Sequence, residues 1–140
     1  YLMNREIGFG RKVLQILEDR NIGWEHMPTG IDDLSIILRS RELTPIKEEE
    51  ILRQLVQKAE VDHAEIEHDL SIIMIVGEKM KRHIGVTATA TRALSENNIN
   101  IQMMSQGSSE VSIMFVVHKD QEKAALKALY QAFFGENKED

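Results

Sequence analysis

A displacement of 77 positions aligns two long stretches of this 140-residue chain on each other without a gap. The matched residues keep the same apolar spacing in both stretches, which a chance series of identities does not produce. The chain is therefore expected to contain two copies of one structural unit. Among the identical pairs are Met3 with Met80, Ile7-Gly8 with Ile84-Gly85, Leu17 with Leu94, Asn21-Ile22 with Asn98-Ile99, Met27 with Met104, Gly30 with Gly107, and Ser35-Ile36 with Ser112-Ile113.

Each copy begins with a glycine, Gly8 or Gly85, that precedes an amphipathic helix. The helix is predicted to end at Asn21 in the first copy and at Asn97-Asn98 in the second, because asparagine tolerates the left-handed conformation of helix ends. Two strands joined by a polar turn follow, which predicts a hairpin in each copy. The predicted strands are 24–27 and 34–38, then 99–104 and 111–117; the helix residues expected in the core are Val13, Ile16 and Leu17, then Val86, Ala90, Ala93 and Leu94.

A second helix is predicted after each hairpin. In the first copy Thr44 is the expected N-cap and Pro45 lies in the first turn, followed by acidic residues that suit the positive end of the helix dipole. The apolar stripe of each second helix is expected to face the core. These stripes are Ile51, Leu52, Leu55, Val56 and Ala59 in the first copy, and Leu126, Leu129, Tyr130 and Phe133 in the second.

Two further strands, 61–67 and 71–76, are predicted between the copies. The order strand, helix, strand, strand, helix, strand is the ferredoxin-like pattern, so the expected fold class is α+β with helices on one face of antiparallel sheets. The expected units are residues 1–69 and 70–140. Two complete units need eight strands and the sequence supplies six, so we expect a fragment. The first unit then lacks its N-terminal strand and the second its closing strand, and at least one partner strand is expected from sequence upstream of Tyr1.

Charge and composition narrow the possible partners. The formal net charge of −6 argues against nucleic acid, and the basic cluster of Lys79, Lys81 and Arg82 is too short to overturn this. The apolar runs are far shorter than the roughly 20 residues needed to span a bilayer. The absence of cysteine excludes disulfides and thiolate metal sites, and it fits a reducing cytoplasm.

The sequence carries no catalytic signature. Phosphate-loop, dinucleotide-binding, nucleophile-elbow and zinc-helix motifs are all missing from the 140 residues. His63, Glu65 and Glu67 alternate along a predicted strand, and we interpret them as a solvent-facing strand rather than a metal site, because no further ligand is spaced to join them. No catalytic residue and no metal are therefore expected in this chain.

One region suits a small zwitterion. The helix start at Gly8 offers backbone N–H groups and partial positive charge, which suit a carboxylate. Glu25 on the next strand, with Asp32 and Asp33 in the turn, would suit an ammonium group. On spacing alone, the alternative that Gly8 and the two aspartates are ordinary turn residues stays open. Met27 and Met104 are expected in the core.

Three sequence stretches then indicate a family. The stretches MNREIGF (3–9), HMPTGIDD (26–33) and MSQGSSE (104–110) closely resemble the regulatory end of bacterial aspartate kinases, which consists of tandem ACT domains. This resemblance covers essentially the whole chain. It implies an upstream kinase domain that phosphorylates the side-chain carboxylate of aspartate with ATP and magnesium. It also implies feedback inhibition by lysine, threonine or both, bound where the first ACT units of two chains pair.

The resemblance also carries over particular residues. Family members that bind lysine use the methionine and phenylalanine of an M-x-x-x-x-G-F motif and the residue three before the phenylalanine, which are Met3, Phe9 and Glu6 here. The family's Val-Asp pair after the first helix corresponds to Trp24-Glu25. The effector carboxylate is expected at the backbone N–H groups from Gly8 to Gly10.

The family's Thr-Ser-Glu turn is replaced by Thr29-Gly30-Ile31-Asp32. Asp32 could take the place of the turn acid, whereas the serine hydroxyl is lost. Lysine sensitivity is therefore the favoured expectation, with threonine or a joint response left open. The alternative is a ligand-free pairing module. In the family the second unit borrows its closing strand from upstream, and exposed sheet edges favour association, so a homodimer is expected.

Overall fold

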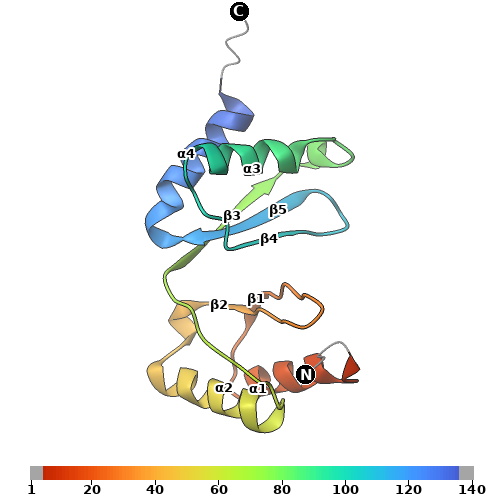
Figure 1. The fold of residues 1–140 in the computed structure, drawn as a ribbon, viewed down its shortest axis with the longest axis vertical. Helices are drawn as coiled ribbons and strands as arrows, with labels where there is room; N and C mark the ends of the chain where they lie inside the picture. The colour runs from red at the N-terminus through yellow and green to blue at the C-terminus, as the bar shows by residue number, and fades with distance from the viewer. Residues whose placement is uncertain (1–4, 136–140) are drawn as a thin grey trace, which may run out of the picture. The chain divides into compact units, whose positions relative to one another are not determined.

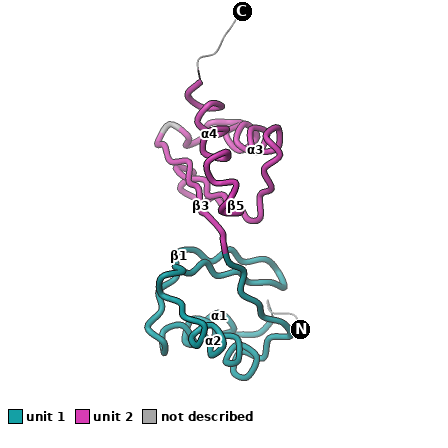
Figure 2. Tube along the Cα trace, turned by 90° about the vertical axis from the view of Figure 1, so that its left-hand side faces the viewer, with its two compact units in different colours: residues 1–68 teal, residues 69–140 magenta. Residues whose placement is uncertain are grey.

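The computed structural model describes residues 5–135 and divides the chain into two compact units, Tyr1–His68 and Asp69–Asp140 (Figures 1 and 2). Each unit places two helices on one face of an antiparallel sheet, which confirms the expected α+β class. Within the described residues, no helix combines the length and apolarity needed to cross a membrane.

The first unit consists of two helices and a short hairpin. Its sheet pairs Trp24 with Leu38 and His26 with Ile37, so Glu25 lies at a bulge in the first strand. A short 3-10 turn links the hairpin to the second helix. The elements are α1 (Phe9–Glu18), β1 (Trp24–His26), β2 (Ile37–Leu38), η2 (Ser40–Glu42) and α2 (Pro45–Lys58).

The core of the first unit forms where α1 packs against α2 and β2. Val13, Ile16 and Leu17 of α1 are buried, as predicted, and they meet Ile51 and Ala59 from the second helical segment. Thr44 caps α2 as expected, since its hydroxyl accepts the Lys47 backbone N–H at 3.3 Å. The prediction for Val56 was wrong. This residue is exposed, because the stripe that contacts α1 is narrower than the run of apolar residues.

An ion-pair cluster joins the turn after α1 to α2. The Glu50 carboxylate accepts a hydrogen bond from the Arg53 guanidinium, one turn along α2. It accepts another from Arg20, with 2.7 Å between Arg20 Nη2 and Glu50 Oε1. The hydrogen bond from Arg53 and then that from Arg20 lower the pKa of the Glu50 carboxyl from its ordinary value of 4.5.

This lowered pKa predicts an acid-sensitive contribution to stability. The contribution is fully present above pH 4.5 and is lost as the pH falls below it, through the pKa of the folded chain. Glu50→Gln should therefore lower the urea midpoint of the first unit at pH 7 and have a smaller effect at pH 3. An equal effect at both pH values would contradict this assignment of Glu50.

The second unit contains a larger, three-stranded sheet. Its strand order is β3-β5-β4, all antiparallel, with Ile73 opposite Phe115 in the β3–β5 ladder. Short 3-10 turns precede α3 and α4. The elements are β3 (Leu70–Val76), η3 (Glu78–Met80), α3 (Val86–Glu96), β4 (Met103–Gln106), β5 (Ser112–His118), η4 (Lys119–Gln121) and α4 (Glu122–Phe134).

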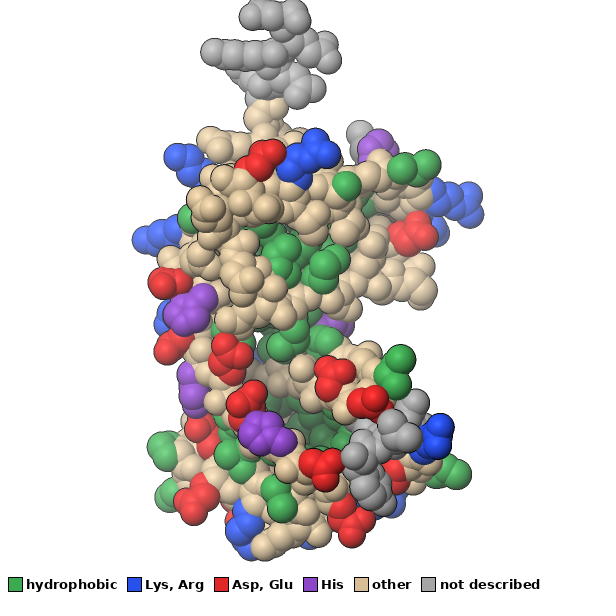
Figure 3. All heavy atoms as spheres, in the orientation of Figure 1, with side chains coloured by type: hydrophobic (Ala, Val, Ile, Leu, Met, Phe, Trp, Pro, Cys, Tyr) green, Lys and Arg blue, Asp and Glu red, His purple; other side chains and the backbone are tan. Residues whose placement is uncertain are grey.

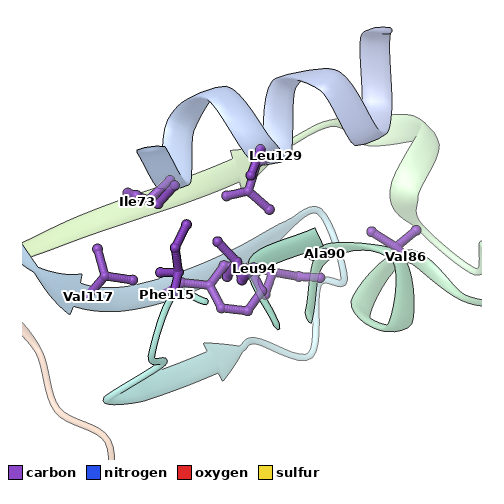
Figure 4. Packing of buried hydrophobic residues seen from close by; sticks show 11 residues of the cluster. Ile73, Val86, Ala90, Leu94, Phe115, Val117 and Leu129 are labelled. Carbon is purple, nitrogen blue, oxygen red and sulfur yellow. The ribbon is translucent and has the colours of Figure 1, made fainter. Parts of the chain in front are cut away.

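Figure 4 shows the core of this unit, in which Phe115 and Leu94 lie between the sheet and the helices. All four residues predicted for the buried face of α3 are buried. The stripe predicted for α4 was wrong in part. Leu126 and Tyr130 are exposed, whereas Leu129 is buried with Ala125 and Ala128. The two alanines let α4 approach the sheet closely, and their small side chains add little to an apolar pattern.

The backbone repeats more faithfully than the side chains do. Gly8 and Gly85 both cap their helices in the left-handed region, with φ of 87° and 95°. Asn21 and Asn98 both have a φ of 55°, which confirms the predicted left-handed conformation. The end of α3 at Glu96, with Asn97 as C-cap, agrees with the prediction, whereas α1 ends three residues before Asn21, at Glu18. At each end a backbone N–H donates to the same relative carbonyl, Ile22 to Leu17 in one unit and Ile99 to Leu94 in the other.

Two strand predictions were wrong in extent, and a third was wrong altogether. The segment 34–38 forms a strand only at Ile37–Leu38, and the segment 99–104 pairs only from Met103 onward. The segment 61–67 is not a strand, because no described residue forms a ladder with it. His63 and Glu65 on this segment are exposed, and the distance between His63 Nε2 and Glu65 Oε2 is 3.5 Å. Met104 was expected in the core but is 45% exposed, whereas Met27 is half-buried.

Candidate functional site

The start of α1 is the first part of the candidate site. Gly8 is the N-cap residue, and in the described part of the chain no side chain caps this helix. The Gly8 carbonyl accepts the Lys12 N–H at 3.0 Å, so the helix is regular from its first turn. Backbone N–H groups at such a start attract an anion. Gly8, Phe9 and Gly10 all lie at this helix start. Their role in holding the carboxylate end of a ligand stays a prediction.

Glu6 lies just before this helix start and is mostly buried. One of its oxygens accepts from the Lys12 ammonium at 2.5 Å. The other oxygen, Oε2, is buried and has no hydrogen-bond partner among the described residues. A buried carboxylate oxygen without a partner is costly, and an ammonium donor supplied by a ligand would satisfy it.

The turn between β1 and β2 is the second part of the site. Its backbone is held by the Gly30 N–H, which donates to the Asp33 carbonyl at 2.9 Å, and by the Ser35 N–H, which donates to the Pro28 carbonyl at 3.0 Å. A Cβ at Gly30 would lie 2.0 Å from Asp33 Oδ1, so this glycine leaves room for the aspartate. Ile31 and Asp32 are exposed at the tip.

Both parts lie at the same end of the first unit, as Figure 1 shows. Phe9 at the start of α1 and Leu34 at the end of the turn pack against one buried cluster. The hydrophobic core therefore fixes the helix start relative to the turn. No hydrogen bond or ion pair within residues 5–135 joins Asp32 to Glu6. Met3 lies outside the described residues.

Trp24 and Glu25 lie on β1, further along the unit. Trp24 is half-exposed. The carboxylate of Glu25 is already paired, because the Arg39 guanidinium donates to its Oε1 across the hairpin. Sequence reasoning did not single out Arg39 or Lys12. The hairpin prediction could have indicated the Arg39 pair, since residues that face each other across a two-stranded ladder are neighbours.

Acidic side chains gather on the first unit in the view of Figure 3. The candidate site itself contains four carboxylates, those of Glu6, Glu25, Asp32 and Asp33. Such a distribution raises the local concentration of cations and disfavours anionic ligands. The site therefore offers carboxylates for an ammonium group and backbone N–H groups for a carboxylate.

The fold and this arrangement define a class of small regulatory modules. Residues 73–133, which form most of the second unit, match the family model for the ACT domain. The second unit is therefore an ACT domain, and the first has the same order of helix, two strands and helix.

The comparisons with whole proteins are more specific. The chain is 50% identical over 134 residues to aspartokinase 3 of Bacillus subtilis, which covers 96% of this chain and 30% of that protein. It superimposes on the crystal structure of Clostridium acetobutylicum aspartate kinase with a TM-score of 0.90 at 34% identity, over 95% of this chain and 30% of that one. The chain belongs to the aspartokinase family and corresponds to its regulatory region.

A third comparison fits the same region. The regulatory subunit of aspartate kinase from Thermus thermophilus, solved in a ligand-free form, is 26% identical. Its TM-score is 0.74, and the match covers 92% of this chain and 84% of that subunit. The chain thus spans nearly all of a regulatory subunit and about a third of the full-length relatives it matches.

Proposed function

We propose that this chain is the allosteric regulatory domain of an aspartate kinase and binds an amino-acid end product, lysine, threonine or both. The observation that carries the proposal is the buried Glu6 oxygen without a partner beside a helix start without a side-chain cap. These two features offer opposite charges to the two ends of one zwitterion. The effector site comprises Met3, Glu6, Gly8, Phe9, Gly10, Trp24, Glu25, Gly30, Ile31 and Asp32.

Regulation by this site requires two arrangements of the protein with different affinities for the effector. The effector then stabilises the arrangement that it binds more tightly, and inhibition requires that the kinase part be less active in that arrangement. Dissociation constants from micromolar to millimolar, about −8 to −4 kcal/mol, suit such sensing. A homodimer formed through the ACT units would connect two such sites, and sedimentation of the chain tests this.

The chemistry of the parent enzyme belongs to its kinase part. We propose ATP-dependent phosphorylation of the aspartate side-chain carboxylate, with ATP and magnesium bound outside this chain. The chain itself would need no cofactor. A cytoplasmic location accompanies this proposal, since ATP and amino-acid end products are available there.

The test is calorimetric titration of the chain with L-lysine and L-threonine, separately and together. We expect saturable binding, and we expect Glu25→Gln to weaken it about tenfold, because a hydrogen bond to a charged group contributes about 1.5 kcal/mol or more. Glu49→Gln removes the same charge from an exposed position on α2 and should leave the affinity unchanged. Binding of neither amino acid to a dimeric chain would favour the ligand-free pairing module instead.

A further inference from the structure

We infer that Arg39 is a specificity-determining residue of the effector site. Its guanidinium is paired with the Glu25 carboxylate, and an ammonium group of the effector has to displace it. The inference rests on the proposed function. It assigns to the site an internal cation that competes with the ligand for the same carboxylate.

The position of Arg39 follows from the hairpin. Arg39 is the first residue after β2 and the N-cap of η2, and its side chain reaches back to the bulged residue Glu25. Its Nε donates to Glu25 Oε1. A carboxylate with a guanidinium already in place has less attraction left for a second cation.

The structure also provides a second position for the displaced guanidinium. Arg39 Nη1 lies 3.6 Å from Glu42 Oε1. The other oxygen of Glu42 accepts the Gly23 backbone N–H at 3.2 Å, which holds this carboxylate in place beside Arg39. Arg39 can therefore leave Glu25 and keep an ionic partner.

Solvent exposure makes the exchange feasible. The side chain of Arg39 is 50% exposed and that of Glu25 is 38% exposed. Ion pairs at this exposure contribute little, so a bound ammonium can replace the guanidinium. The pair then affects the choice of ligand, because only a ligand whose cation reaches Glu25 has to break the pair between Glu25 and Arg39. A ligand whose cation does not reach Glu25 is unaffected by Arg39.

The experiment compares Arg39→Gln with Arg41→Gln, which removes the same charge from a neighbouring exposed position. Removing Arg39 should raise the affinity for L-lysine about two- to fivefold, the range that corresponds to an exposed pair. Arg41→Gln should leave the affinity unchanged. L-norleucine, which has the chain length of lysine without its side-chain ammonium, separates the two ammonium groups. A gain for lysine alone assigns the side-chain ammonium to Glu25, and a gain for both assigns the α-ammonium.

A double variant controls for indirect effects. In a Glu25→Gln background, Arg39→Gln should no longer raise the affinity for lysine. The ¹⁵N resonance of Arg39 Nε in the unaltered chain gives a readout that does not depend on a variant, and it should shift on saturation with lysine.

The outcomes separate this inference from the proposed function. If the unaltered chain binds neither lysine nor threonine, the proposed function fails. If it binds lysine while Arg39→Gln leaves the affinity unchanged or lowers it, the proposed function stands and the role of Arg39 is overturned. An Arg39 Nε chemical shift that stays unchanged at saturation with lysine would overturn the role of Arg39 as well.

Discussion

Phe115→Ala is expected to destabilise the second unit by about 3–5 kcal/mol, the usual cost of removing a buried phenylalanine. Phe115 is fully buried on the central strand β5 and lies opposite Ile73 in the ladder. Leu94 of α3 and Leu129 of α4 belong to the same buried cluster (Figure 4). Because these neighbours come from separate elements, the cavity cannot close by moving any one of them.

The measurement is urea unfolding followed by far-ultraviolet circular dichroism. The matched control is Phe134→Ala, since Phe134 is exposed at the end of α4, where its ring lies beside that of Tyr130 with 5.2 Å between the centroids. The control should cost less than about 1 kcal/mol. Similar losses for the two variants would show that the core of the second unit is not organised around Phe115.

Ile16→Ala is expected to destabilise the first unit by about 2–5 kcal/mol. Ile16 is buried on α1 and packs with Val13 and Ala59 in a smaller cluster than the core of the second unit. The sequence contains one tryptophan, Trp24, which lies on β1 of the first unit. Its fluorescence therefore reports on the unfolding of the first unit.

The control for this change is Ile46→Ala, which removes the same atoms from an exposed position at the start of α2. It should change the free energy of unfolding, measured by fluorescence, by less than about 0.5 kcal/mol. If the unfolding midpoint measured by Trp24 fluorescence is the same in Ile16→Ala as in the unaltered chain, either this fluorescence does not report on the core or other contacts hold α1.

The helices could be predicted from the sequence because their signals are local. A glycine at each start, an asparagine after each first helix and the Thr44-Pro45 cap all act within a few residues. Strand limits depend on partners elsewhere in the chain. The segment 61–67 has the composition of a strand, yet no described residue pairs with it, and the sequence alone does not show this.

The same difference between local and tertiary signals holds for the residues of the candidate site. The motif around Gly8 and the turn at Gly30 were found because their residues are contiguous, and the core then brings them to one end of the unit. Arg39 was missed, because its importance arises only when the hairpin closes and places it against Glu25. A charge pair between segments is a tertiary feature, and neither residue alone distinguishes it from ordinary surface charge.

The hairpin of the first unit has one more consequence. Its strands are three and two residues long, so few ladder hydrogen bonds hold it closed. Such a hairpin opens locally at a lower free energy than the unit as a whole. An effector that binds only the closed form has an apparent affinity reduced by the closed fraction. Substitutions that stiffen these two strands can therefore set the concentration at which the amino acid is sensed without ever contacting it.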